Sequence, residues 1–495
     1  MRYVGALDQG TTSSRFMIFD EDGSVVASAQ EEHRQIMPEP GWVEHDALEI
    51  WAKVCKVIER ALATAGLQGS DLVAIGITNQ RETTVAWDRT TGQPLYNAIV
   101  WQDTRGQVIL DTFTEEVKNK VTHKTGLAIA PYFSGSKMSW MLKHLPEVTE
   151  AAANGNLLFG TIDSWIIWNL TKGLHVTDVT NASRTLLMEL ESLAWDNELL
   201  EIFGVPATSL AHIRSSSEIY GRTSVDGPLK SEVPIAGILG DQHAAMVGQL
   251  CFDRGDTKCT YGTGNFALVN TGTDIVRSTQ GLLTTVCFKF GDQPARYALE
   301  GSVAVTGSAV QWLRDQLGII QSSQDVETLA ASVPDNGGVY FVPAFSGLFA
   351  PYWRNDARGV LVGLTRAATK SHIARATLEA IAFQTKDVID AMAAETGVTL
   401  STLRVDGGIT QNNLCMQIQS DLLQIEISRP VISETTALGA AYAAGLATGV
   451  WPDLDSLKIQ WKESARWAPS ESSELPTTGY HNWKRAIERT LNWIE

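Results

Sequence analysis

A strand, a short polar turn and a second strand follow one another near the start of this chain, and the same order recurs beyond its midpoint. Residues 3–20 consist of an apolar run, a polar turn around Gly10 and another apolar run, and residues 257–270 repeat this order around Gly262 and Gly264. Antiparallel strands in direct succession are not typical of a purely parallel β/α sheet. We therefore expect two related α/β domains, each with a mixed sheet flanked by helices, and a cleft between them.

The length of the chain agrees with a division into two parts. Its 495 residues exceed what a single hydrophobic core serves. No flexible linker rich in glycine and serine separates the halves, and the most suitable boundary lies near residues 248–256. We expect an N-terminal domain of residues 1–250 and a C-terminal domain of residues 251–495.

End signals and apolar spacing predict the main helices and strands. Asp46 precedes a run with helical spacing that ends before Gly66, and residues 373–392 form a long helical pattern closed by Gly397. Residues 72–77 are continuously apolar and predict a buried strand.

Charge and cysteine content exclude several classes of protein. The formal net charge of −17 argues against a nucleic-acid binder or a protein of anionic membrane surfaces. The five cysteines form no CxxC pair, which indicates free thiols in a reducing compartment. No apolar run approaches 18 residues, so we expect no membrane span and a cytoplasmic location. We also expect a homo-oligomer, either a dimer or a tetramer.

Several nucleotide-binding signatures can be tested directly. The P-loop pattern and the protein-kinase motifs are both absent from the sequence. Gly262, Gly264 and Ala267 match the GxGxxA dinucleotide fingerprint, but that fingerprint must open a helix, and residues 266–270 have the pattern of a strand. We therefore reject a dehydrogenase.

The first polar turn is a candidate phosphate site. A tight hairpin carrying Thr11, Thr12 and Ser13 can direct backbone N–H groups and hydroxyls to one side, which makes an anion site without lysine. Asp8 at the end of the strand could hold Mg²⁺, which prefers oxygen ligands. The alternative is a plain surface hairpin, but the similar turn at residues 262–264 favours two turns that clamp a polyphosphate.

Asp241 is the candidate general base. It follows an apolar strand at residues 235–239, and a carboxylate at a strand end in a cleft can accept a proton from a substrate hydroxyl. The alternative is an N-cap for a helix at residues 242–249. We interpret His243, in the first turn of that helix, as a packed core residue.

Arg81 and Glu82 follow the strand at residues 72–77. A guanidinium that donates and a carboxylate that accepts can hold a polyol from two directions. The alternative is a surface ion pair of little energetic value. For the aromatic residues Trp101 and Tyr132, ordinary packing is the preferred interpretation from the residues alone.

Together these segments resemble the FGGY family of carbohydrate kinases, of the actin-like, ribonuclease-H-like ATPase fold, and within it the branch that phosphorylates glycerol. The matching segments follow the family's order over almost the whole chain. They are residues 6–15, 76–84, 97–102, 131–135, 181–185, 240–242, 261–264 and 341–353.

The resemblance implies Mg²⁺-dependent phosphoryl transfer from ATP to glycerol, giving sn-glycerol 3-phosphate and ADP, with Asp241 as the general base. The implied glycerol-binding residues are Arg81, Glu82, Trp101, Tyr132, Asp241, Gln242 and Phe266. The expected ATP-binding residues are Thr11, Thr12, Ser13, Arg15, Thr263, Gly307, Gln311, Gly408 and Asn412. Asp8 and Asp241 would face the magnesium ion.

One departure from the family bears on regulation. Some bacterial members bind fructose 1,6-bisphosphate through a glycine-rich loop and an arginine, and Glu232 stands at the position of that arginine. We therefore do not expect regulation by this bisphosphate. Two alternative functions are kept: an FGGY kinase for a larger polyol or sugar, and a non-catalytic actin-like nucleotide-binding protein.

Overall fold

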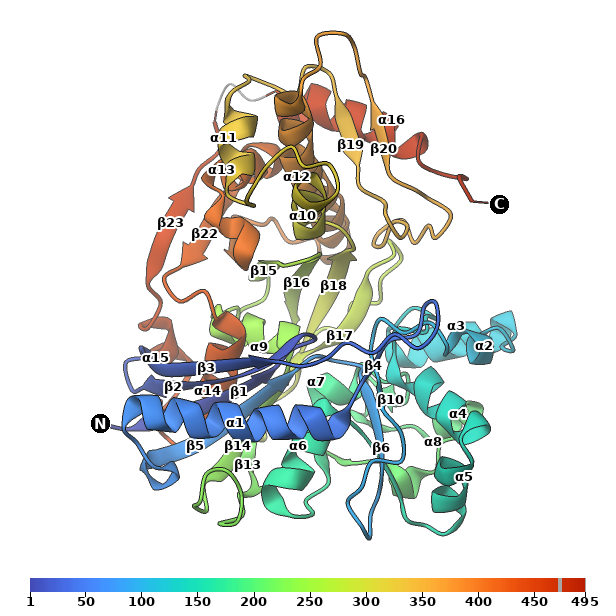
Figure 1. The fold of residues 1–495 in the computed structure, drawn as a ribbon, viewed down its shortest axis with the longest axis vertical. Coiled ribbons are helices and arrows are strands. Elements are labelled where there is room, and N and C mark those ends of the chain that lie inside the picture. Colours follow the sequence, from blue (N-terminus) through green and yellow to red (C-terminus); the bar gives the residue numbers. More distant parts are fainter. Residues whose placement is uncertain (471–473, 495) are drawn as a thin grey trace.

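Two mixed β-sheets organise the chain, one in each half (Figure 1). The computed structural model describes residues 1–470 and 474–494. The strands of the first sheet, from one edge to the other, are β13 (Ser217–Arg222), β14 (Pro234–Gly240), β5 (Leu72–Asn79), β1 (Tyr3–Gln9), β2 (Ser13–Asp20) and β3 (Val25–Glu32). Strands β1, β5 and β14 are parallel to one another, whereas β2, β3 and β13 run antiparallel to their neighbours.

The second sheet repeats the plan of the first. Its strands, in order, are β17 (Leu283–Phe288), β18 (Arg296–Val303), β16 (Asn265–Gly272), β15 (Thr257–Tyr261), β21 (Thr402–Asp406), β22 (Glu426–Pro430) and β23 (Glu463–Trp467). The order β18-β16-β15-β21-β22 and its strand directions correspond to β3-β2-β1-β5-β14. The predicted fold class of two related α/β units with mixed sheets is confirmed.

Helices cover both faces of each sheet, and one helix lies between the sheets. Helices α1 (Ala47–Ala65) and α6 (Ile162–Thr171) pack on one face of the first sheet. Helices α12 (Lys370–Thr396) and α13 (Asn413–Leu423) pack on the outer face of the second, and α16 (Tyr480–Glu488) packs against α12. Helix α9 (Asp241–Gly248) shares one apolar cluster with residues of both sheets, so its N-terminus lies where the two halves meet.

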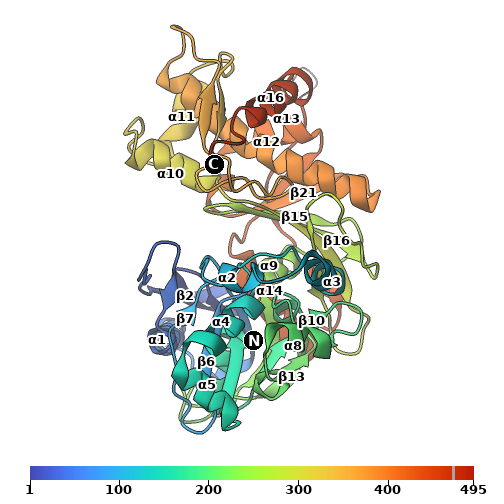
Figure 2. The same ribbon diagram turned by 90° about the vertical axis from the view of Figure 1, so that its right-hand side faces the viewer.

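Helix α14 (Thr435–Ala447) comes from the second half of the chain but packs on β1, β5 and β14 of the first sheet and against α9. The two helices approach so closely that a Cβ on Gly439 would lie 1.8 Å from the carbonyl oxygen of Ala244. Glycine is therefore required at this position. Figure 2 shows α14 in the lobe of the N-terminal half, opposite α12, α13 and α16.

Local signals in the sequence predicted the ends of the long helices. The side chain of Asp46 accepts hydrogen bonds from the backbone N–H groups at the start of α1, and Gly66 ends that helix at φ 67°. Helix α12 spans Lys370–Thr396 and is capped by Gly397, which has φ 63°. Residues 265–272 form strand β16, as the rejection of the dinucleotide fingerprint required.

The remaining elements are shorter. A small sheet contains β4 (Glu44–His45), β7 (Ala98–Ile99), β6 (Thr84–Asp88) and β8 (Leu157–Thr161). The short strands outside these three sheets are β9 (Val176–Asp178), β10 (Met188–Glu189), β11 (Ala194–Trp195), β12 (His212–Arg214), β19 (Tyr340–Val342) and β20 (Val360–Val362). The other helices are α2 (Gln107–Leu110), α3 (Glu115–Thr125), α4 (Ser134–His144), α5 (Pro146–Ala153), α7 (Val179–Ala182), α8 (Asn197–Phe203), α10 (Gly307–Asp315), α11 (Asp325–Ala331) and α15 (Leu454–Lys458). Within residues 1–470 and 474–494, no helix combines the length and the apolar character that a membrane crossing needs.

Candidate functional site

Three parallel strands of the first sheet end at one edge and bring the predicted site segments together. Asp8 pairs with Thr78 in the β1–β5 register, and Gly240 pairs with Asn79 in the β5–β14 register. The residues that follow these strands are therefore neighbours in space although they are far apart in sequence. This edge is where open α/β sheets bind their ligands.

Asp241 lies at this edge, at the N-terminus of α9. It is the first residue of the helix, and the N-cap position belongs to Gly240, so the interpretation of Asp241 as the N-cap was wrong. Its Oδ1 accepts a hydrogen bond from the backbone N–H of Gln242 at 2.7 Å and lies 3.0 Å from Nε of Arg81. The side chain remains 29% exposed, so its carboxylate is accessible to a substrate.

Arg81 and Glu82 are buried, so the alternative of a surface ion pair was wrong. Their side chains are each 2% exposed, with Arg81 Nε 3.9 Å from Glu82 Oε1. Arg184 Nε donates to Glu82 Oε1 at 2.7 Å. Glu300 accepts from Arg81 Nη1 at 2.6 Å and Nη2 at 3.0 Å, and from Arg184 Nη2 at 3.1 Å. These four side chains, which we call the buried charge cluster, adjoin Asp241 through Arg81.

The pKa values of the cluster follow from burial and from the opposite charges. Burial lowers the pKa of Arg81, but Glu300, Glu82 and Asp241 outweigh burial and hold that pKa well above its usual range. Burial raises the pKa of Glu300, yet the guanidinium groups of Arg184 and Arg81 bring it below its ordinary value. The pKa of Glu82 is raised by burial, which Arg81 and Arg184 offset only in part.

Three aromatic side chains line the same region and are half-buried. The ring centroids of Trp101 and Tyr132 lie 5.4 Å apart in an edge-to-face arrangement. Trp101 Nε1 donates to Thr11 Oγ1 at 3.0 Å, which joins the aromatic wall to the first polar turn. Phe266 belongs to the second half, and its ring centroid lies 5.9 Å from Cζ of Arg81. These rings lie at the rim of the site, which agrees with the preferred interpretation of core or rim packing for Trp101 and Tyr132.

Gln242 and Phe266 share a buried partner in Lys258 of β15. Lys258 Nζ donates to Oε1 of Gln242, and it also donates to the carbonyl oxygen of Phe266 at 3.3 Å and to Thr260 Oγ1 at 3.0 Å. The pKa of Lys258 is lowered by burial. Gln242 therefore lies at the site, and its side-chain oxygen is held by the second half of the chain. His243 is fully buried, as its interpretation as a packed residue required.

The first polar turn is held in place by neighbouring strands. The backbone N–H of Gly10 donates to the carbonyl oxygen of Ser13 at 2.9 Å, and Gln30 Nε2 donates to Ser13 Oγ at 2.8 Å. Thr12 is exposed, and its carbonyl oxygen accepts a hydrogen bond from the backbone N–H of His33 at 3.1 Å. Arg15 follows the turn and forms an ion pair with Glu434, which precedes α14. In this structure the guanidinium of Arg15 therefore has a protein partner.

The second polar turn adjoins the start of α10. The backbone N–H of Gly307 donates to the carbonyl oxygen of Gly262 at 3.1 Å, and that of Ser308 donates to the carbonyl oxygen of Thr263 at 3.1 Å. Gln311 lies one turn further along the same helix and is exposed. The turn and the N-terminus of α10 thus form one surface.

The segment after β21 packs on this second turn. A Cβ on Gly407 would lie 2.3 Å from the carbonyl oxygen of Tyr261. Gly408 follows, and Asn412 caps α13 by accepting from the backbone N–H of Cys415 at 2.8 Å. The predicted ATP residues therefore form two groups, and no hydrogen bond joins residues 10–13 with residues 262–264 in the described part of the chain.

The carboxylates of Asp8 and Asp241, beside the first polar turn, fit a magnesium ion. Asp8 and Asp241 lie at the same strand edge, because Asp8 pairs with Thr78 and Gly240 pairs with the next residue of β5. Burial raises the pKa of Asp8 to about 6, an effect that Arg15 counteracts and the carboxylate of Asp241 reinforces. A divalent cation between them would relieve this repulsion. Among the described residues, no three His, Cys, Asp or Glu side chains converge as a complete metal cage. One or two carboxylates completed by phosphate oxygens is the coordination that Mg²⁺ prefers.

Three residues of the site were missed from the sequence alone. Glu300 and Lys258 stand within the buried strands β18 and β15, and Arg184 lies in the resembling segment 181–185 but received no role. A charged residue inside an apolar strand is rare unless it is paired, and this signal could have identified Glu300.

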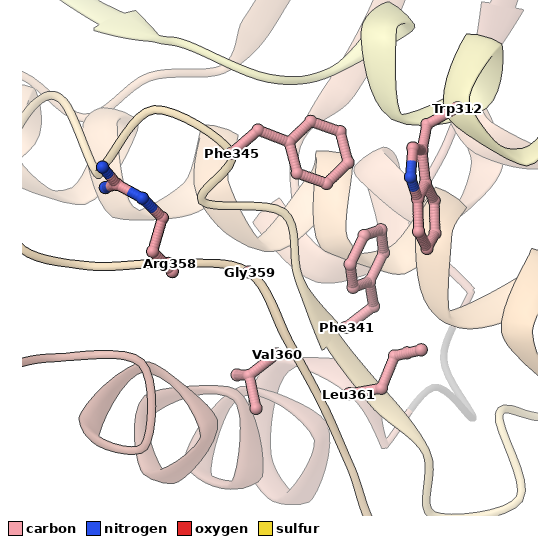
Figure 3. A pocket seen from close by; sticks show the side chains of 7 residues that line it. All are labelled: Trp312, Phe341, Phe345, Arg358, Gly359, Val360 and Leu361. Carbon is pink, nitrogen blue, oxygen red and sulfur yellow. The ribbon is translucent and has the colours of Figure 1, made fainter. Parts of the chain in front are cut away.

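An apolar hollow in the second half is lined in part by Trp312 of α10, the helix that carries Gly307 and Gln311 (Figure 3). Its lining contains one charged side chain, Arg358, and no carboxylate. The residues around it are Trp312, Phe341, Phe345, Arg358, Gly359, Val360 and Leu361. Acid–base chemistry therefore belongs to the edge of the first sheet rather than to this hollow.

Comparison with known proteins gives a consistent result. The profile of the FGGY family of carbohydrate kinases, N-terminal domain, matches residues 3–248, and that of the C-terminal domain matches residues 257–448. Glycerol kinase 1 of Streptomyces coelicolor is 59% identical over 100% of this chain and 99% of its own length.

Solved structures agree with these matches. The crystal structure of Plasmodium falciparum glycerol kinase with ADP is similar with a TM-score of 0.93 at 39% identity, covering 100% of this chain and 99% of that chain. A ligand-bound xylulose kinase from Lactobacillus acidophilus has a TM-score of 0.86 at 22% identity, covering 99% and 97% of the two chains, which shows a common fold.

Proposed function

The chain belongs to the FGGY family of carbohydrate kinases, and on that premise we propose that it transfers the γ-phosphoryl group of ATP to glycerol, giving sn-glycerol 3-phosphate and ADP. Among the observations at the site, the one that carries the proposal is the accessible carboxylate of Asp241. It lies 3.0 Å from Arg81 Nε at the strand edge that also holds the first polar turn. A carboxylate so placed can orient a hydroxyl and accept its proton.

The acceptor side uses residues from both halves. Arg81 donates to glycerol hydroxyls and Glu82 accepts from them, which fixes the orientation of the substrate. Trp101, Tyr132 and Phe266 pack against its carbon atoms, since their rings lie beside one another and beside Arg81. The terminal hydroxyl then faces Asp241, which accepts the proton as the new O–P bond forms. The bond between the γ-phosphorus and its bridging oxygen breaks, and ADP leaves.

The donor side uses the two polar turns. Backbone N–H groups and hydroxyls of Thr11, Thr12 and Ser13 bind phosphate oxygens from one side, and Thr263 with the N-terminus of α10 at Gly307 binds them from the other. We propose that Gln311, Gly408 and Asn412 bind the nucleoside end of ATP. Asp8, with Asp241 beside it, would hold Mg²⁺, which neutralises charge on the transferring phosphoryl group when bound.

Closure of the two halves would exclude water from the reaction. Water and glycerol are both hydroxyl nucleophiles. In an open cleft, water could therefore attack ATP, and ATP would be hydrolysed without phosphorylation of glycerol. We propose that residues 1–250 and 251–495 form the two domains and that they close around a hinge near residue 250. Because α14 packs on the first sheet, it would move with the N-terminal domain during closure.

We further propose a cytoplasmic enzyme that assembles as a dimer or a tetramer. The five cysteines are free thiols, which agrees with a reducing compartment. We expect no regulation by fructose 1,6-bisphosphate, since Glu232 would repel an anionic sugar.

A coupled assay of ADP formation across a panel of acceptors tests the function. We expect strong preference for glycerol over pentuloses and hexitols, together with a requirement for Mg²⁺. Preference for a pentulose would instead make the protein a sugar kinase of the same family. ATP binding without ADP formation on any acceptor would indicate a non-catalytic nucleotide-binding protein.

A further inference from the structure

The carboxylate of Glu300 lies between two arginine side chains that come from the other half of the chain. It accepts from both terminal nitrogens of Arg81, at 2.6 and 3.0 Å, and from Arg184 Nη2 at 3.1 Å. Glu300 belongs to β18 of the second sheet, whereas Arg81 follows β5 of the first. Its side chain is 1% exposed. Such two-pronged contacts fix both the distance and the plane of a guanidinium.

The contacts of Glu300 determine which nitrogens of the two guanidinium groups face Asp241 and Glu82. With the terminal nitrogens of Arg81 engaged, Nε of that residue points to Asp241 at 3.0 Å. Because Glu300 also engages Nη2 of Arg184, Nε of Arg184 is left for Glu82 at 2.7 Å. The positions of the proposed base and of the proposed acceptor-binding carboxylate thus both depend on Glu300.

The charges of the cluster make this dependence strong. Within the buried charge cluster, Arg81 and Arg184 carry two positive charges and Glu82 and Glu300 two negative charges, and the adjoining Asp241 adds a third negative charge. All but Asp241 are almost completely buried. Buried charges are costly unless they are paired, so removal of one partner forces the others to move. Nη1 of Arg184 is buried and has no hydrogen-bond partner in the described part of the chain, so the cluster retains one free donor group.

We propose that Glu300 is a positioning residue for the acceptor site. It holds Arg81 and Arg184 so that Asp241 and Glu82 face a polyol, and it does so from the opposite half of the molecule. Binding of the acceptor is thereby coupled to the arrangement of the two halves. This inference rests on the proposed function, because it assigns the role through the glycerol-binding residues.

The test compares Glu300→Gln and Glu300→Asp with a matched control. Glu379 of α12 is also a buried glutamate of the second half, with a side chain that is 2% exposed. It accepts from Nε of Arg375 at 2.8 Å and from Nδ2 of Asn336 at 2.7 Å. Glu379→Gln therefore removes another buried, paired carboxylate of the second half that does not contact the acceptor residues. KM for glycerol, KM for ATP, kcat and the melting temperature are measured for all three variants and the unmodified protein.

We expect Glu300→Gln to raise KM for glycerol by about 10- to 100-fold, the range for loss of a hydrogen bond to a charged group. KM for ATP should change by less than about threefold. Glu300→Asp keeps the charge but is one methylene shorter, so its KM for glycerol should lie between those of the unmodified protein and Glu300→Gln. Glu379→Gln should change the melting temperature, whereas KM for glycerol and KM for ATP should change by similar factors.

Three outcomes would overturn the proposal. One is a Glu300→Gln variant whose KM for glycerol changes no more than that of Glu379→Gln. Another is a parallel rise in both KM values, which would indicate a purely structural role. If Glu300→Gln does not fold, Glu300→Asp decides the matter, and an unchanged KM for glycerol in that variant would also contradict the role.

Failure of the proposed function is detected separately. The unmodified protein is first assayed with glycerol and with the acceptor panel. If it prefers another acceptor, the function is wrong, and the same variants are then compared with that acceptor. If no acceptor supports ADP formation, neither proposal stands.

Discussion

Nε of Arg81 lies 3.0 Å from Oδ1 of Asp241, and this contact joins the end of β5 to the start of α9. The orientation of the carboxylate is fixed by a guanidinium that is itself held at its terminal nitrogens by Glu300. The proposed base therefore does not depend on its own rotamer preferences alone. Its position is set by a buried cluster with contributions from both halves.

Replacement of Asp241 tests the role of this carboxylate. Asp241→Asn keeps the shape of the side chain but removes its ability to accept a proton, so kcat should fall by roughly 100- to 10,000-fold. The measurement is ADP formation at saturating glycerol and MgATP. A kcat within about threefold of the unmodified value would refute the assignment of the general base. The melting temperature serves as the control for folding.

The ion pair between Arg15 and Glu434 leads to a prediction about ATP. Arg15 must leave Glu434 to bind a phosphate, so Glu434→Gln should lower KM for ATP by about two- to fivefold and leave KM for glycerol unchanged. The two side chains are 22% and 41% exposed, so the effect should shrink as salt increases.

A second surface pair provides the control for Glu434. Nε of Arg2 lies 3.2 Å from Oε2 of Glu21, and the two side chains are 50% and 41% exposed. This pair lies at the end of the β1–β2 hairpin that is remote from the first polar turn. Glu21→Gln should leave KM for ATP unchanged. A KM for ATP that stays constant or rises in Glu434→Gln would show that the ion pair with Glu434 does not hinder the binding of ATP by Arg15.

Two glycines of the second turn have different steric surroundings. A Cβ on Gly264 would lie 2.3 Å from the carbonyl oxygen of Val303, whereas a Cβ on Gly262 would meet only the carbonyl oxygen of Gly264 at 3.6 Å. Gly264→Ala should therefore lower the free energy of unfolding by about 1–3 kcal/mol. Gly262→Ala should leave it nearly unchanged. The melting temperatures of the two variants check this difference, and equal values would contradict it.

The buried carboxyl of Asp163 predicts a dependence of stability on pH. Burial raises its pKa from 3.8 to about 7, against the hydrogen bonds from Thr161 and Thr177. Between these values the folded state keeps a proton that the unfolded state has lost. Stability due to this group is complete below about pH 4 and is lost as the pH rises through 7.

Asp163→Asn isolates this contribution because the amide does not titrate. As the pH rises from about 4 to about 7, the free energy of unfolding of the unmodified protein should fall relative to that of Asp163→Asn by about 1.4 kcal/mol for each pH unit. Urea unfolding of both proteins at several pH values measures it. A difference that does not vary with pH would mean that Asp163 is ionised in the folded protein.

Much of the candidate site could be predicted because its residues stand beside recognisable strand ends and turns. The polar turn at Thr11–Ser13, Arg81 and Asp241 were all found in this way, and the structure places Arg81 and Asp241 in direct contact. The interpretation of Asp241 as an N-cap failed because Gly240 occupies that position. Sequence pattern alone cannot distinguish two adjacent helix-start positions.

The sequence by itself determined the features that depend on a few neighbouring residues. The hairpin turns, the capping of α1 by Asp46 and its end at Gly66 follow from backbone preferences that act within one or two turns. Only the tertiary structure decided that Glu300 meets Arg81 and Arg184, and that α14 packs on the first sheet. The physical reason is that burial and pairing of a charge depend on which surfaces come together, and no local preference in the chain records that choice.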